Sequence, residues 1–155
     1  MVLLCLCLWG WALPGQNSGR AKPSPATISV KGPIVAKRGA SITAPVIVTV
    51  AKGYHVTSAK PEDRYLKPLR ISWDKGALLP DATRYPKAVL RSYPFSEGKL
   101  SVLDGTFTIE QDFRIPATTP QGFGAITGKL SYQACTETEC LPPATLPIRM
   151  SYDIR

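Results

Sequence analysis

The segment Tyr-Gln-Ala-Cys-Thr-Glu-Thr-Glu-Cys-Leu-Pro-Pro, residues 132–143, lies between two runs of alternating apolar residues. The first run covers 125–135, and the second covers 146–154. Alternation with a period of two is typical of β-strands that bury one face. We therefore predict two strands joined by a corner, with Cys135 at the end of the first strand and Cys140 before the second.

The spacing of the two cysteines limits their chemistry. Four residues separate Cys135 from Cys140, which is longer than a thioredoxin-like Cys-x-x-Cys motif, and no βαβ pattern surrounds them. We predict a disulfide across a tight turn. Closing so short a loop stabilises a fold by only about 2 kcal/mol, which favours a pair that takes part in chemistry. Export would equally permit an ordinary structural disulfide at this corner, so both interpretations stay open.

The charges inside the loop bear on which partner attacks first. Glu137 and Glu139 lie between the two cysteines, and nearby carboxylates disfavour a thiolate. The pair therefore resembles one that cycles with a partner whose own cysteine is activated. A thiol metal site is a weaker alternative, because His55 is the only histidine and structural zinc needs four ligands. We predict no metal site.

Alternating segments also occur earlier in the chain, and no convincing helical pattern accompanies them. The alternating segments are 27–30, 41–50, 54–57, 69–73 and 100–115. Asp104 and Gly105 interrupt the last of these and indicate a β-hairpin. We predict an all-β fold of about eight short strands, arranged as an immunoglobulin-like antiparallel β-sandwich. The Cys…Trp…Cys pattern of true immunoglobulin domains is absent, so we expect the disulfide at one end of the sandwich.

The first residues have the composition of an export signal. Residues 1–15 contain an apolar run, with Cys5 and Cys7 inside it, that is too short to span a bilayer comfortably. We interpret them as a signal peptide or its remnant, the alternative being a short membrane-anchoring tail. Residues 16–25 are rich in Gly, Ser, Pro and Lys and predict a flexible linker. The folded domain is expected at 26–155, and the location periplasmic or otherwise exported.

The charge pattern argues against some partners. The 155-residue chain carries a formal charge of +8, but its basic residues are scattered and not clustered with aromatic residues. This pattern argues against nucleic-acid binding, and we expect no stable membrane insertion. The basic surface is most simply a solvated one, although it could also steer an acidic partner.

The cysteine segment closely resembles the motif of one family. The run Tyr-Gln-Ala-Cys-x4-Cys-Leu-Pro-Pro is similar to that of the N-terminal periplasmic domain of the thiol:disulfide interchange protein DsbD, also called the disulfide bond corrector domain family. Residues 52–56, Lys-Gly-Tyr-His-Val, resemble the family's entry to a strand, and residues 93–99 fall where the family carries a loop that caps the disulfide. The resemblance covers 27–155.

The resemblance implies an immunoglobulin-like sandwich and a thiol–disulfide interchange activity. Cys140 would form the intermolecular bond and Cys135 would resolve it, with no organic cofactor or metal. Candidate capping or supporting residues are Phe95, Tyr54, His55, Tyr132 and Gln133. The chain departs from the family at His55 and Thr57, where the family has tyrosines, so an acid–base role does not transfer directly.

The resemblance also implies partners. A thioredoxin-like reductant domain or protein would supply electrons, and a periplasmic disulfide isomerase or a cytochrome-maturation type thiol protein would receive them. The rival hypothesis is a non-catalytic immunoglobulin-like module that binds a protein partner and carries a structural disulfide. A disulfide that a thioredoxin-like protein reduces in the folded state would favour exchange, whereas resistance until unfolding would favour the binding module.

Overall fold

The structure is a computed structural model that describes residues 24–155. In this part of the chain, twelve β-strands form three four-stranded sheets, and no helix is present. The predicted all-β, immunoglobulin-like fold class is confirmed. The number of strands is larger than the expected eight, because several strands are only two or three residues long and carry no readable alternation. The proposed signal segment, 1–15, and most of the proposed linker lie outside the described residues.

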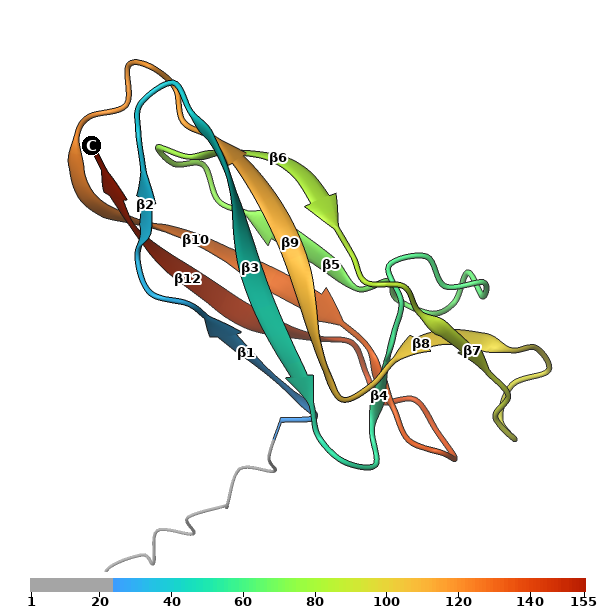
Figure 1. The fold of residues 1–155 in the computed structure, drawn as a ribbon. Helices are drawn as coiled ribbons and strands as arrows, with labels where there is room; N and C mark the ends of the chain where they lie inside the picture. Colours follow the sequence, from blue (N-terminus) through green and yellow to red (C-terminus); the bar gives the residue numbers. More distant parts are fainter. Residues whose placement is uncertain (1–23) are drawn as a thin grey trace, which may run out of the picture.

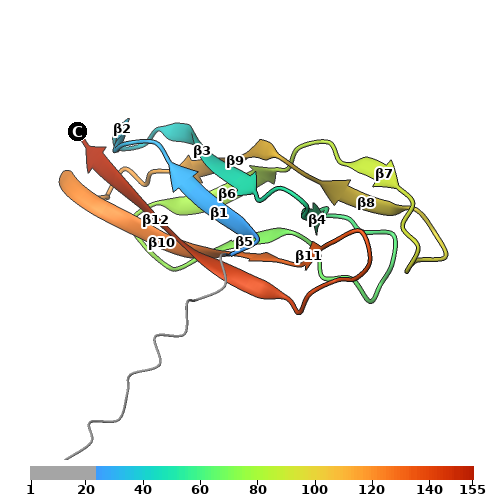
Figure 2. The ribbon, with the colours of Figure 1, turned by 90° about the horizontal axis from the view of Figure 1, so that it is seen from below.

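Two of the sheets form the sandwich and the third extends it at one end. The first sheet has the order β1 (Ala26–Val30), β3 (Ser41–Val50), β9 (Thr106–Arg114), β6 (Leu79–Arg84). The second has the order β2 (Ile34–Ala36), β12 (Ala144–Ile154), β10 (Gly122–Tyr132), β5 (Arg70–Trp73). The third has the order β11 (Ala134–Cys135), β4 (His55–Thr57), β8 (Leu100–Leu103), β7 (Val89–Arg91). Figures 1 and 2 show this small sheet at the end of the molecule away from the C-terminus.

Strand alternation places the core between the first two sheets. In β3, the side chains of Ala44, Val46, Val48 and Val50 are buried, and the intervening ones are more exposed. The same pattern in β9, β10 and β12 directs Ile109, Leu130, Ile148 and others into one cluster. All strand pairs are antiparallel except β2–β12. Period-two burial on both sheets is what an aligned sandwich requires.

The expected hairpin at 100–115 is wrong in its pairing. The turn is present, and Gly105 adopts a positive φ of 62°, which suits glycine. However, β8 pairs with β4 and β7, whereas β9 pairs with β3 and β6. Both edges of β9 are therefore paired with strands that are longer than β8. The chain passes from the small sheet to the first large sheet at this turn.

The small sheet has a core of its own. Tyr93, Leu100 and Val102 form a second buried cluster, with Leu66 packed against it. This cluster covers the sheet that carries Cys135.

Within residues 24–155, no helix has the length and hydrophobicity needed to cross a bilayer.

Candidate functional site

The two cysteines form a disulfide across a tight β-hairpin, as predicted. Cys135 ends β11 and is the antiparallel bridge partner of Cys140. The two are bonded, with their Cα atoms 3.9 Å apart. On either side of them, the Thr136 amide donates to the Glu139 carbonyl at 2.7 Å and the Leu141 amide donates to the Ala134 carbonyl at 2.8 Å. The hairpin is therefore held by backbone hydrogen bonds as well as by the disulfide.

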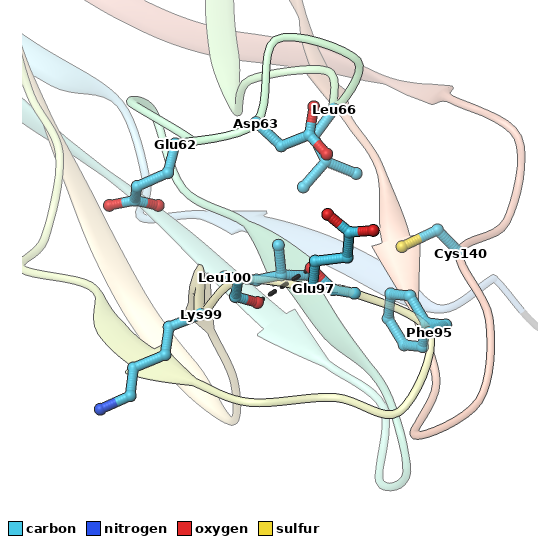
Figure 3. Close-up of a pocket in the computed structure, with 10 residues that line it drawn as sticks. Glu62, Asp63, Leu66, Phe95, Glu97, Lys99, Leu100 and Cys140 are labelled. Carbon is cyan, nitrogen blue, oxygen red and sulfur yellow. Dashed lines mark hydrogen bonds between the residues drawn. The ribbon is translucent and has the colours of Figure 1, made fainter.

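The two sulfurs differ in their access to solvent. Cys135 is fully buried, at 0% exposure. Cys140 is half-buried and lines an open pocket of about 570 Å³. Figure 3 shows the Cys140 sulfur pointing into this pocket, between Leu66 and Phe95. A reagent or a partner protein can thus approach Cys140, whereas Cys135 is reached only through its bond to Cys140.

The pocket beside Cys140 combines an apolar surface with acidic groups. Its apolar lining comes from Leu66, Leu100 and Phe95. Phe95 is 37% exposed, so its ring is held less firmly than a core residue. The charged lining consists of three carboxylates and one lysine: Glu62, Asp63, Glu97 and Lys99. The pocket is therefore acidic, although the chain as a whole is basic.

Three aromatic rings form a stack above the small sheet. The rings of His55 and Tyr93 have centroids 4.3 Å apart and an interplanar angle of 16°. Tyr93 stacks in turn on Phe95, with centroids 5.4 Å apart. The stack therefore extends from β4 to the mouth of the pocket beside Cys140. Tyr93, which is buried, links the sheet to the exposed ring of Phe95.

Strand register places His55 next to Cys135. The two residues are direct partners in the antiparallel pair β4–β11, and Val56 pairs with Ala134 beside them. Val56 and Ala134 belong to the main sandwich core. Because successive strand residues point to opposite faces, His55 and Cys135 share the other face of the small sheet. Side chains opposite each other in an antiparallel pair have Cβ atoms about 5 Å apart.

Burial determines the electrostatics of the stack. It lowers the pKa of His55 below its usual 6.5; Glu137 and Asp104 act in the opposite direction, and Arg91 adds to the lowering. Burial raises the pKa of Tyr93. The His55 Nε2 atom and the Tyr93 hydroxyl are buried without a hydrogen-bond partner among the described residues. Buried polar groups without partners are unusual and call for an explanation.

Gln133 ties the cysteine hairpin to a neighbouring loop. Its Oε1 atom accepts a hydrogen bond from the Lys67 amide at 2.9 Å, and its Nε2 atom donates to the Leu141 carbonyl at 3.1 Å. Its backbone carbonyl accepts from the Thr57 amide at 3.1 Å. One residue thus connects β4, the 58–69 loop and the exit of the disulfide hairpin.

Some of the candidate residues are brought together and others are not. Phe95 shares a pocket with Cys140, and His55 is the strand partner of Cys135. Tyr132 is buried in the main core, with its hydroxyl 3.2 Å from Ser24 Oγ, and Tyr54 packs against the same core. Sequence reasoning did not single out Tyr93 or Leu66. The only signal for Tyr93 was its place at the start of the 93–99 segment.

The site offers no assembled metal ligands. The sulfurs of Cys135 and Cys140 are bonded to each other. Among residues 24–155, no group of three or more His, Cys, Asp or Glu side chains is arranged to hold a metal ion.

Similarity to known proteins is found at the level of structure. No protein-family model and no curated protein sequence matches the chain. The reduced N-terminal domain of DsbD from Neisseria meningitidis superimposes with a TM-score of 0.51 and 16% identity, over 90% of this chain and 99% of that one. The N-terminal periplasmic domain of ScsB from Proteus mirabilis superimposes with a TM-score of 0.55 and 12% identity, over 81% of this chain. The match covers only 44% of that ScsB chain.

At these identities, the likeness establishes the fold. The chain has the immunoglobulin-like β-sandwich of the DsbD N-terminal domain. The fold and the site together define a β-sandwich with a disulfide at one end, one sulfur of which faces an open pocket.

Proposed function

We propose that the protein is an exported thiol–disulfide exchange module that passes electrons through the Cys135–Cys140 pair. The observation that carries the proposal is the unequal access to the two sulfurs: Cys135 is buried, whereas Cys140 faces an open pocket. Exposed disulfides tend to be the labile, regulatory or catalytic ones. The structural likeness to the DsbD and ScsB domains supports the same function.

The exchange step follows from this access. The thiolate of a reduced thioredoxin-like partner attacks Cys140 Sγ, and the bond between Cys140 and Cys135 breaks. Its electron pair stays on Cys135, which becomes a thiolate and takes up a proton. A second thiol of the partner then releases the mixed disulfide, which leaves this protein as a dithiol and oxidises the partner. The dithiol can next reduce a disulfide in another exported protein, such as a disulfide isomerase or a cytochrome-maturation type thiol protein.

The lining of the pocket favours a particular partner surface. A segment that reaches Cys140 passes Glu62, Asp63 and Glu97 on the way. Complementary charges speed association and exclude wrong partners. We therefore expect basic side chains beside the partner's attacking cysteine, together with an apolar residue that packs against Leu66 and Leu100.

A trapping experiment tests the assignment of the two sulfurs. A thioredoxin that lacks its resolving cysteine is activated as a mixed disulfide with nitrothiobenzoate. It is added to the reduced, folded protein, which carries Cys5→Ala and Cys7→Ala together with either Cys135→Ala or Cys140→Ala. The Cys135→Ala variant is expected to form a covalent complex through Cys140, because the free thiol of Cys140 is accessible. Mass spectrometry identifies the linked residue. Cys140→Ala is the matched control and should react far more slowly. Equal trapping by both variants, or trapping through Cys135 alone, would contradict the proposal.

A further inference from the structure

His55, whose Nε2 atom is unpartnered, is the strand partner of the buried Cys135. His55 and Cys135 are strand partners on the same face of the small sheet. His55 is 2% exposed, and its Nε2 atom has no hydrogen-bond partner among residues 24–155. Leaving a buried polar atom unpaired destabilises the fold, because the atom has lost its hydrogen bonds to water. The arrangement is explained if the partner of this nitrogen exists only in another redox state.

The disulfide form cannot donate a hydrogen bond to the imidazole, but the dithiol form can. A disulfide sulfur has no proton to donate, whereas a reduced Cys135 carries an S–H group. Burial in apolar surroundings disfavours a thiolate, so a reduced Cys135 needs a base before it can act as a nucleophile. The only imidazole of the chain is the side chain opposite it.

We propose that His55 is the general base that deprotonates Cys135 when this cysteine resolves a mixed disulfide. The proposal rests on the exchange function proposed above and adds a residue to its chemistry. His55 is not a conservative equivalent of the tyrosines that the DsbD family carries on this strand, because imidazole accepts a proton near neutral pH. The stack on Tyr93, at 4.3 Å, fixes the plane of the ring.

Resolution of the mixed disulfide transfers two electrons from this protein to the client. In the mixed disulfide, Cys140 Sγ is bonded to a sulfur of the client protein. His55 takes the proton from Cys135 Sγ, and the resulting thiolate attacks Cys140 Sγ. The bond between Cys140 and the client breaks, and its electron pair leaves on the client sulfur. The Cys135–Cys140 disulfide is thereby formed, and the client disulfide has been reduced by two electrons.

The proton has a route to solvent. His55 lines a second open pocket of about 450 Å³, on whose wall Lys52, Tyr54, Arg91, Asp104 and Glu137 also lie. These groups, with Tyr93 stacked on the ring, are the charged and titratable side chains that surround the imidazole. Burial holds the pKa of His55 below 6.5, so the ring is neutral and able to accept a proton at neutral pH. The imidazolium formed in the step can release its proton into this pocket.

The test uses the reduced full chain carrying Cys5→Ala and Cys7→Ala, so that Cys135 and Cys140 are its only thiols, and the aromatic disulfide dithiobis(nitrobenzoate) as the probe. Attack by Cys140 releases one nitrothiobenzoate in a first phase, and resolution by Cys135 releases the other in a second phase. His55→Gln removes the base and the ring, and His55→Phe removes the base but retains a ring against Tyr93. Both variants are expected to slow the second phase on the order of 10²-fold at neutral pH, as for the loss of a general base. The first phase should remain unchanged, because it belongs to Cys140.

The pH profile separates a base from a merely structural side chain. In the unmodified protein, the rate of the second phase should rise as His55 loses its proton and then level off around neutrality. In both variants, the rate of the second phase should instead rise continuously with hydroxide concentration over the same pH range. An unchanged rate and profile in the variants would overturn the role of His55 and leave the exchange function standing. Release of only one nitrothiobenzoate per molecule of the protein that retains His55 would show that Cys135 does not resolve the mixed disulfide, and would overturn the exchange function as well.

Discussion

Phe95 and Cys140 line the same pocket, so an exposed aromatic ring lies beside the more accessible sulfur of the disulfide. The ring is anchored through Tyr93, which stacks on it at 5.4 Å. Tyr93 belongs to the cluster of the small sheet and not to the sandwich core, so we expect that Phe95 can move without disturbing the sandwich core. The role of Phe95 as a cap stays a prediction, which the following experiment tests.

Phe95→Ala should make the disulfide easier to reduce in the folded protein. Removing the ring opens the pocket beside Cys140, so we expect reduction by dithiothreitol under native conditions to become several-fold faster. The effect on stability should be below about 1.5 kcal/mol, because the ring is 37% exposed and full burial of Phe contributes about 1.5–3 kcal/mol. Phe123→Ala is the matched control, since Phe123 is 85% exposed and lies in β10. An unchanged rate for Phe95→Ala would argue against a cap.

Gln133→Ala should destabilise the site more than its partial exposure implies. The substitution removes the hydrogen bonds from Lys67 and to Leu141 that join two loops. At about 0.5–1.5 kcal/mol for each bond, we expect the free energy of unfolding in urea to fall by about 1–3 kcal/mol. Gln121→Ala, at an exposed position, should change it by less than about 0.5 kcal/mol. Equal effects of the two substitutions would contradict this account of Gln133.

Gln111 is a polar residue in the middle of the core. It is fully buried, accepts from Trp73 Nε1 at 3.0 Å and from Thr83 Oγ1 at 2.6 Å, and donates to the Asp112 carbonyl at 2.8 Å. Gln111→Leu would leave these partners unpaired, so we expect a loss of about 2–4 kcal/mol in unfolding free energy. Thr108→Ala, exposed on the same strand, is the control. A neutral or stabilising Gln111→Leu would show that the network does not hold β6 against β9.

The stability of the oxidised protein should depend on His55 in a defined pH window. The folded-state pKa of His55 is below its usual 6.5, so the unfolded chain binds more protons just below 6.5. Stability should therefore fall as the pH drops from 6.5 towards the folded-state value. His55→Phe should abolish this slope in urea unfolding followed between neutral pH and pH 5. A slope that persists in the variant would assign the dependence to another group.

Asp112 titrates in a separate, more acidic window. Arg84 and Thr43 donate hydrogen bonds to this carboxylate and lower its pKa from 3.8 to about 2. The contribution of Asp112 to the stability of the fold is present above pH 3.8 and is lost as the pH falls through about 2. The two pH windows do not overlap, so the His55 slope can be measured without interference from Asp112.

The sequence predicted the elements whose periodicity is long enough to read. The alternation in 41–50 and 125–135 corresponds to β3 and β10, and the cysteine spacing predicted the disulfide correctly. The small sheet was not predicted as a sheet, since its strands are two to four residues long. Periodicity within one segment also cannot reveal which strands pair, and the hairpin at 100–115 was wrong for this reason.

The site was predicted in part for the same physical reasons. A local motif predicted Cys135, Cys140 and Gln133 as site residues, and the structure places the first two in one disulfide and Gln133 next to them. The approach of His55 to Cys135 depends on the β4–β11 register, and the role of Tyr93 depends on stacking between segments far apart in the chain. Neither relationship can be predicted from the local sequence.

The most direct test of the central claim is the reduction potential of the Cys135–Cys140 pair in the folded protein, measured by equilibration against glutathione or dithiothreitol buffers. A pair that exchanges electrons with thioredoxin-like partners should have a potential of roughly −120 to −270 mV. A value well below about −300 mV would mark a structural disulfide. That result would contradict the exchange function and favour the alternative hypothesis of a non-catalytic binding module with a structural disulfide.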